Sequence, residues 1–240
     1  MKKLEQIYEG KAKKVFRTDD PERFIVEYKD DATAFNGQKR GTILGKGSIN
    51  NSMTNLLMQM LEKHGVPTHF VEELNDRETV VKKVEIVPLE VIIRNISAGH
   101  FASNYGVEEG IVFEHPTIEF SYKNDDLHDP LMNAYHAVAL KLATWEEIEL
   151  IKKYAFAVND TLKAFWSECG VTLVDFKLEF GKTVDGQIVL ADEISPDTCR
   201  LWDKDTNEKL DKDRFRRDLG NVEDAYQEVM SRLLAKSAEK

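Results

Sequence analysis

The segment "LVDFKLEFG", from Leu173 to Gly181, alternates apolar and charged residues along its length. Strict alternation of this kind is typical of a β-strand, whose apolar side chains face the core while the others share the opposite face. Asp175, Lys177 and Glu179 therefore line one face of this strand, as acid, base and acid. We expect a face of this kind to bind a charged ligand.

The residues that follow predict a hairpin. Asp185-Gly186 is a common two-residue turn signal, and a tight turn there would set Glu179 directly opposite Asp192. The β-carbons would then lie about 4.5–5.5 Å apart, and the carboxylates would repel by about 3 kcal/mol at an effective dielectric of about 20. A divalent cation would offset this repulsion, and oxygen ligands beside Lys177 suit Mg²⁺ that carries a nucleotide. The alternative is a longer, splayed loop with a solvated strand face and no close pair.

Length and composition narrow the class of protein. The chain has 240 residues, a formal net charge of −10 and two cysteines. This length suits one large domain or two small ones, and the negative charge argues against a nucleic-acid-binding protein, whose footprint is basic. Two cysteines cannot form a disulfide framework, and the sequence contains no long uncharged apolar run. We therefore expect a cytoplasmic protein that binds neither nucleic acid nor membranes.

Strand and helix patterns form separate clusters along the chain. Strand patterns occur in residues 11–16, 23–28, 68–74 and 79–96. Apolar residues at helical spacing predict helices from about Ser48 to Gly65, from Thr144 to Cys169 and over 221–235. Residues 95–130 are expected to be rich in loops. This clustering favours an α+β fold, and Pro88 is the expected boundary between an N-terminal lobe (1–88) and a C-terminal lobe (89–240).

A second candidate for ligand binding is the stretch "YEGKAKKVF", residues 8–16. Gly10 permits a tight turn and close backbone approach, and Lys11, Lys13 and Val15 would then share one face of the following strand. Backbone amides and lysines in this arrangement resemble the glycine-rich lid that covers phosphates in kinases. The alternative is a solvated, lysine-rich N-terminus.

Arginines supply a third candidate feature. Arg94 follows an apolar run that ends a predicted strand, and Arg200 follows the segment "EISPDTC". Arginine at such positions favours paired hydrogen bonds to phosphate or carboxylate, although surface arginines that pair with nearby acids are the alternative. Together with the hairpin, these residues indicate Mg-nucleotide chemistry on a small anionic molecule, by positioning and charge stabilisation.

Taken together, these and further motifs resemble the phosphoribosylaminoimidazole-succinocarboxamide synthases (SAICAR synthetases) of purine biosynthesis. The motifs are "YEGKAKKVF", "DDATAFNG", "GKGSINN", "PLEVIIRNISAGHF", "KNDDLHDP", "LVDFKLEFG", "LADEISPDTCRLWD" and "DKDRFRRDLG". The resemblance implies an ATP-dependent ligase, acting as a homodimer, that joins carboxyaminoimidazole ribotide (CAIR) to L-aspartate and releases ADP and phosphate. It also implies a kinase-like N-terminal antiparallel sheet lobe and an ATP-grasp-like C-terminal lobe, with the nucleotide in the cleft between them.

The resemblance also assigns roles to individual residues. It implies that the nucleotide is bound by Gly10, Lys11, Ala12, Lys13, Val15, Lys82, Val84 and Glu179, and that the backbone of Lys82 and Val84 contacts adenine. Mg²⁺ would be held by Glu179 and Asp192, and Lys177 and Asp175 would be catalytic. The substrates would be bound by Arg94, Gly99, His100, Asp129, Arg200, Lys212 and Arg216. His100 stands where many relatives have a serine that helps to hold the ribotide phosphate. The alternatives are a small-molecule kinase on the same scaffold and a module that binds Mg-ATP without turnover.

Overall fold

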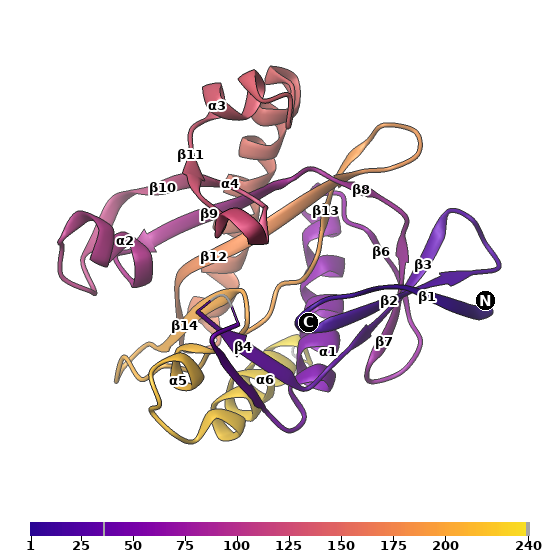
Figure 1. Ribbon diagram of the computed structural model, residues 1–240. Coiled ribbons are helices and arrows are strands. Elements are labelled where there is room, and N and C mark those ends of the chain that lie inside the picture. Colours follow the sequence, from indigo (N-terminus) through magenta and orange to yellow (C-terminus); the bar gives the residue numbers. More distant parts are fainter. Residues whose placement is uncertain (36, 239–240) are drawn as a thin grey trace.

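An antiparallel five-stranded sheet forms the N-terminal part of the structure, a computed structural model that describes residues 1–35 and 37–238. Its strands lie in the order β1-β2-β3-β7-β6. Their bounds are β1 (Lys3–Glu9), β2 (Lys13–Thr18), β3 (Arg23–Tyr28), β6 (Phe70–Glu73) and β7 (Glu78–Lys82). The strand predicted over residues 23–28 is confirmed as β3. In Figure 1 this sheet occupies the right-hand side of the view.

A larger antiparallel sheet forms the C-terminal part, in the order β11-β10-β9-β12-β13, with β8 and β14 also paired to β12. Its strands are β8 (Glu85–Ile86), β9 (Leu89–Ile96), β10 (Val112–Tyr122), β11 (Leu131–Met132), β12 (Val171–Lys182), β13 (Ile188–Ala191) and β14 (Cys199–Asp203). The segment Leu173 to Gly181 therefore lies in the strand that has the most partners in this sheet. Figure 1 shows β9 and β12 side by side through the middle of the molecule.

Helices and a small hairpin complete the fold. The hairpin pairs β4 (Asp31–Ala34) with β5 (Lys39–Thr42). The helices are α1 (Lys46–Lys63), α2 (Gly99–Tyr105), α3 (Ala134–Ala139), α4 (Trp145–Glu168), α5 (Asp213–Arg216) and α6 (Val222–Ser237), with a short 3-10 helix, η1 (Asp125–Leu127). The prediction for α4 is confirmed, including its capping box: Thr144 Oγ1 accepts from Glu147 N at 3.2 Å, and Glu147 Oε2 accepts from Thr144 N at 2.9 Å. The α+β fold class is confirmed as well.

The main apolar core joins the large sheet to α1, α4 and α6. It includes Leu57, Val158, Phe176 and Val229, each at most 1% exposed. Burial of one such side chain contributes about 1.5–3 kcal/mol. Because α1 precedes Pro88, this core continues across the expected lobe boundary, and a division of the chain at that proline stays a prediction.

The expectation of a loop-rich region over residues 95–130 is wrong. The region contains α2 and the 11-residue strand β10, which pairs with β9. Pro116 lies in the irregular stretch of that pairing, between Val112 and Thr117. Since proline has no N–H to donate to a neighbouring strand, it is tolerated at such a bulge and hides the strand from a sequence pattern. No helix within the described residues is long and apolar enough to cross a membrane.

Candidate active site

The charged face of β12 is a buried surface. Asp175 is 4% exposed and Glu179 is 3% exposed, and the Lys177 side chain between them is 25% exposed. The alternative of a solvated strand face is therefore wrong. Charges at this depth require partners, because an unpaired buried ion is strongly disfavoured.

The hairpin closes in a different register from the one predicted. Glu179 lies opposite Ala191, and Asp192 follows one residue later. The turn uses three loop residues, 184–186, and Gly186 takes the left-handed conformation at φ 84°. The predicted two-residue turn is wrong because Asp-Gly also suits a three-residue loop, with the glycine at its left-handed position.

Asp192 nevertheless reaches the same cluster of charges as Glu179. It lies just beyond β13 with φ 59°, and its carboxylate pairs with Lys13 and, at 3.3 Å from Oδ2, with Lys177 Nζ. Lys177 Nζ also lies 2.6 Å from Glu179 Oε1, and Lys123 Nζ lies 2.9 Å from the same oxygen. The two carboxylates are thus brought together by a shared lysine and by the left-handed backbone at Asp192.

The sequence predicts a metal ion that offsets the repulsion between the Glu179 and Asp192 carboxylates. In the structure, lysine side chains offset it. We call this group the lysine–carboxylate cluster; its members are Lys13, Lys123, Lys177, Glu90, Glu179, Asp192 and Glu193. Burial opposes ionisation of Asp192, but the Lys13 and Lys177 ammonium groups hold the pKa of that carboxyl well below its usual value. Burial likewise opposes a charge on Lys177, yet Glu179 and Asp192 raise the pKa of the ammonium. Each of these two groups is charged by virtue of its neighbours.

Sequence reasoning missed three members of this cluster. All three lie inside motifs that carry the family resemblance: Lys123 in "KNDDLHDP", Glu193 in "LADEISPDTCRLWD" and Glu90 in "PLEVIIRNISAGHF". Glu90 lies on β9, and its carboxylate is 3.6 Å from Lys177 Nζ. A motif places a residue in a family pattern, but only the pairing of β9 with β12 shows which side chains meet.

The donor set fits a magnesium ion that arrives with a nucleotide. Among residues 1–35 and 37–238, no three His, Cys, Asp or Glu side chains are grouped so that they could hold a metal ion alone. Glu179 and Asp192 supply hard oxygen ligands, as Mg²⁺ requires, and leave other coordination positions for water and phosphate oxygens. A complete protein cage is therefore not needed.

A second group of charges surrounds Asp175 at the other end of the same face. Arg94 Nη1 lies 2.6 Å from Asp175 Oδ2, and Arg200 Nη1 lies 3.0 Å from the same oxygen. Arg94 Nε also donates to Glu119 Oε1 at 2.6 Å, and Arg200 Nε donates to Asp213 Oδ2 at 2.8 Å. We call these residues the arginine cluster. Paired guanidinium groups fixed in this way are suited to planar recognition of carboxylate or phosphate.

Arg216 joins the arginine cluster through Asp213, whose Oδ1 accepts from Arg216 Nη1 at 2.7 Å. Asp211 lies behind it, fully buried, and accepts from the backbone N of Leu201 and of Asp213, both at 2.7 Å. Burial, with the Asp213 charge added, raises the pKa of Asp211 to about 7. A negative charge on Asp211 therefore destabilises the folded protein near neutral pH.

Lys212 belongs to a third, separate group. Its Nζ lies 3.4 Å from Asp197 Oδ2, which Lys46 Nζ approaches to 2.9 Å. Tyr226 donates to the other carboxylate oxygen at 2.5 Å. Lys46 and Tyr226 are fully buried, so this group joins α1 to α6 in the interior.

The turn at Gly10 is tight, as predicted. Gly10 N donates to Lys13 O at 2.8 Å, and the Tyr8 ring lies 3.1 Å from the position that a β-carbon would take at Gly10. The strand begins at Lys13, so the expectation that Lys11 shares its face is wrong. Lys11 Nζ instead pairs with Asp125 Oδ1 at 2.8 Å, on the surface. Only Lys13 of this segment enters the lysine–carboxylate cluster.

Three further residues that the resemblance assigns to nucleotide binding make contacts within the protein. Ala12 O accepts from Lys29 N at 2.8 Å, and Val15 lies opposite Val26 in the sheet. Lys82 ends β7, and its Nζ donates to Thr68 O at 2.9 Å.

Val84 lies where the two sheets meet. A β-carbon at Gly181 would be 2.6 Å from Val84 Cγ2, so only glycine permits this approach. A pocket of about 280 Å³ opens beside it, lined by residues 83–85 and 182–184. This pocket adjoins the backbone that the resemblance assigns to adenine.

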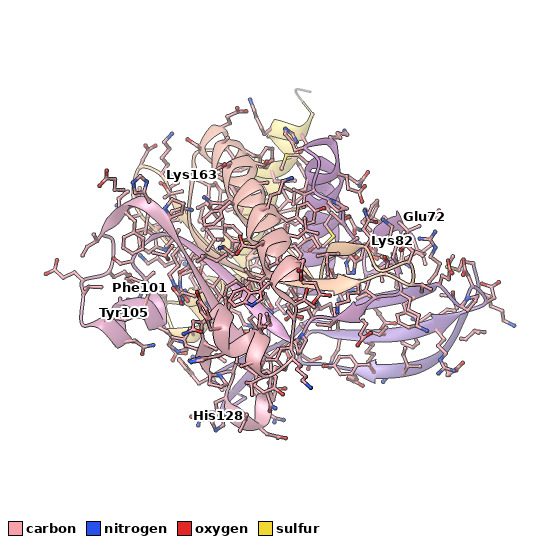
Figure 2. All side chains as sticks on the ribbon, turned by 90° about the horizontal axis from the view of Figure 1, so that it is seen from above. Glu72, Lys82, Phe101, Tyr105, His128 and Lys163 are labelled. Carbon is pink, nitrogen blue, oxygen red and sulfur yellow. The ribbon has the colours of Figure 1, made fainter. Side chains whose placement is uncertain are left out.

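Gly99, His100 and Asp129 take different positions. Gly99 packs against the Arg200 guanidinium, which brings α2 onto the arginine cluster. His100 is exposed on the first turn of α2, and Asp129 Oδ1 accepts from Asn124 N at 2.8 Å beside η1. Figure 2 shows Phe101 and Tyr105 of α2 at the opposite side of the molecule from Lys82. Of the predicted substrate residues, Gly99 therefore lies at the arginine cluster, whereas Asp129 lies beside η1, whose Asp125 pairs with Lys11.

Comparison with known proteins gives a consistent picture. A family model described as SAICAR synthetase matches residues 6–233. The chain is 66% identical over 233 residues to phosphoribosylaminoimidazole-succinocarboxamide synthase from Lachnoclostridium phytofermentans, which covers 97% of this chain and 99% of the relative. It is 60% identical over 233 residues to the synthase of the same name from Clostridium botulinum strain Hall, with the same coverage.

Two solved structures are also similar. The crystal structure of the synthase from Ehrlichia chaffeensis has a TM-score of 0.94 at 47% identity, covering 96% of this chain and 99% of that one. A SAICAR synthetase in complex with ADP has a TM-score of 0.92 at 47% identity, covering 95% of this chain and 97% of that one.

Proposed function

The chain belongs to the SAICAR synthetase family, and we propose that the charged face of β12 is where it carries out the reaction of that family. The activity is SAICAR synthase activity in de novo purine biosynthesis. In this reaction ATP drives the joining of CAIR to L-aspartate, with release of ADP and phosphate. A cytoplasmic location and a homodimer are part of the proposal.

The nucleotide would lie between the two sheets, under a kinase-like N-terminal lobe and over an ATP-grasp-like C-terminal lobe. The ion pair of Lys13 with Asp192 and the pocket beside Val84 support this position, because each involves residues of both sheets or of the segments that join them. The ADP complex of a similar protein supports nucleotide binding in general. The segment from Gly10 to Val15 would cover the nucleotide, and Lys82 and Val84 would meet adenine through their backbone.

Mg²⁺ would be held by Glu179 and Asp192, where it would neutralise the phosphate oxygens of the nucleotide. Lys13, Lys123 and Lys177 already neutralise these carboxylates. With a cation bound there, the ammonium groups of Lys13, Lys123 and Lys177 would be free to pair with phosphate. Lys177, which contacts both carboxylates, is best placed to stabilise charge as the terminal phosphoryl group leaves ATP.

The arginine cluster would bind CAIR. Arg94 and Arg200 are held in place by Asp175, so their positions are set before the ligand arrives, and little ordering is needed on binding. The remaining substrate-binding residues in the proposal are Gly99, His100, Asp129, Lys212 and Arg216. Phosphoryl transfer would then take place at Lys177, in the lysine–carboxylate cluster. The anionic ribotide would be recognised by Arg94 and Arg200, in the arginine cluster.

The observation that carries this proposal is that Lys177 bridges Glu179 and Asp192. Calorimetric binding of ADP with and without Mg²⁺ tests it in Glu179→Gln and Asp192→Asn. Loss of one charged ligand should weaken the Mg-dependent affinity by about 10- to 100-fold. Asp185→Asn, on the exposed hairpin turn, is the matched control and should bind as the wild type does. Unchanged Mg²⁺ dependence in both site variants would contradict the assignment.

A further inference from the structure

Lys46, the first residue of α1, is fully buried and pairs with Asp197. Its Nζ lies 2.9 Å from Asp197 Oδ2, and Tyr226 of α6 donates to Oδ1 at 2.5 Å. Lys212 Nζ lies 3.4 Å from the same Oδ2. We call Lys46, Asp197, Lys212 and Tyr226 the Asp197 group. In this group two lysines from distant parts of the chain share one carboxylate.

The Asp197 group contains more positive charge than it neutralises. Burial, with the Asp197 charge added, raises the pKa of Tyr226 well above its usual value, so the phenol is neutral. Burial opposes ionisation of Asp197, but Lys212 and Lys46 lower the pKa of that carboxyl. Two ammonium groups therefore meet a single negative charge. Where water is largely excluded, such an excess favours the arrival of an anion.

Lys212 is the basic member of the Asp197 group that solvent reaches. Its side chain is 13% exposed, whereas Lys46 and Tyr226 are fully buried. Lys212 N also donates to Pro196 O at 3.0 Å, so both its backbone and its side chain are bonded to the segment that contains Asp197. The excess charge is therefore presented by a lysine whose position is fixed before a ligand arrives.

Lys212 also borders the arginine cluster. The next residue, Asp213, accepts from Arg200 Nε at 2.8 Å and from Arg216 Nη1 at 2.7 Å. Burial, with the Arg216 and Lys46 charges added, lowers the pKa of Lys212. An anion that binds beside Lys212 would stabilise its charged form. The Asp197 group thus offers a cation next to the proposed CAIR site.

We propose that Lys46 is a positioning residue that neutralises Asp197 from the interior and so leaves the Lys212 ammonium free to bind an anionic oxygen of a substrate. This inference rests on the proposed function, in which Lys212 binds substrate. CAIR and L-aspartate both carry such oxygens, so the test distinguishes between them. Without Lys46, the Asp197 carboxylate would be neutralised by Lys212 alone, and the pair would offer no net charge.

The test is steady-state kinetics of Lys46→Met, with CAIR, L-aspartate and Mg-ATP varied in turn. Methionine keeps an unbranched apolar side chain and removes the charge. The KM for CAIR or for L-aspartate should rise about tenfold, and the one that rises identifies the substrate that Lys212 binds. The KM for Mg-ATP should stay as in the wild type. Lys63→Met, exposed in the last turn of α1, is the matched control and should change none of the three.

A purely structural role for Lys46 predicts a different result. Lys46→Met would then lower the free energy of unfolding in urea and the amount of active protein, while the KM for each substrate stayed unchanged. That outcome would overturn the proposal.

Tyr226→Phe keeps the test decisive if Lys46→Met does not fold. It keeps the ring and removes the hydrogen bond to Asp197 Oδ1, so the carboxylate should pair more strongly with Lys212. The KM for CAIR or for L-aspartate should then rise about threefold. With Lys46→Met unfolded, wild-type KM values for both substrates in Tyr226→Phe would refute the inference.

Lys212→Met separates this inference from the proposed function. It should raise the same KM by about 10- to 100-fold, and adding Lys46→Met should then cause little further change, because residues that act through one group are not additive. If Lys212→Met raises the KM for neither substrate, the assignment of Lys212 to the substrate site fails, and the inference fails with it. If Lys212→Met raises one of them and Lys46→Met does not, the assignment of Lys212 holds and the role of Lys46 is refuted.

Discussion

Replacing Gly99 by alanine should displace Arg200 from the arginine cluster. A β-carbon at Gly99 would lie 2.4 Å from Arg200 Nη2 and 2.7 Å from Cζ, so the guanidinium must move. It cannot move freely, since Nε is bonded to Asp213 at 2.8 Å and Nη1 to Asp175 at 3.0 Å. The substitution therefore adds backbone strain, at φ 53°, to the loss of a charged hydrogen bond.

The expected loss of stability is the sum of the backbone strain and the lost hydrogen bond. The left-handed conformation costs an alanine about 1 kcal/mol, and the loss of one charge-assisted hydrogen bond costs about 1.5–3 kcal/mol. The free energy of unfolding should fall by about 2.5–4 kcal/mol, which lowers Tm by roughly 10 °C for a chain of this size. The KM for CAIR should rise as well, because Arg200 is part of the proposed CAIR site.

Gly106→Ala is the matched control for Gly99→Ala. Gly106 ends the same helix with φ 63°, and no described atom lies within 4 Å of the position that a β-carbon would take there. It shares the strain without the collision, so it should lose about 1 kcal/mol and keep the wild-type KM for CAIR. Urea unfolding and steady-state kinetics measure both quantities. Equal losses of stability in the two variants would refute the reasoning.

Two further predictions concern the charged clusters. Lys177→Met should lower kcat by about 10²- to 10³-fold and remain folded, because Lys13 and Lys123 still pair with the two carboxylates; Lys152→Met, on α4 and paired with Glu149, is the kinetic control. A Lys177→Met protein that is unfolded by circular dichroism would instead make this lysine structural. Since the pKa of Asp211 is raised from 3.8 to about 7, ionising it destabilises the native state, and the free energy of unfolding should fall as pH rises from about 4 to about 7. Asp211→Asn should remove that component, and identical pH slopes for the variant and the wild type in urea unfolding would disprove it.

The sequence predicts those features that local patterns determine. Alternation identifies the charged face of β12, and the Thr144 capping box locates the start of α4. The tight turn at Gly10 is also predictable, because the turn and the strand it precedes are adjacent in the chain. Each of these features is decided by residues within a few positions of one another.

Features that depend on distant pairing could not be predicted in this way. Asp185-Gly186 permits turns of two or three residues, so the sequence does not decide whether Glu179 lies opposite Ala191 or Asp192. The left-handed φ of Asp192 is not predictable from the sequence either. Asp175 meets Arg94 only because β9 and β12 pair.

Phosphate release shows directly whether the protein is a ligase that couples ATP cleavage to the joining of CAIR and L-aspartate. The purified protein would be given ATP and Mg²⁺ with CAIR, with L-aspartate, with both or with neither. We expect sustained release only when both are present, in an amount equal to the SAICAR formed. Sustained release with either substrate alone, or ADP formation with the phosphoryl group transferred to a hydroxyl and no free phosphate, would contradict it and favour a small-molecule kinase.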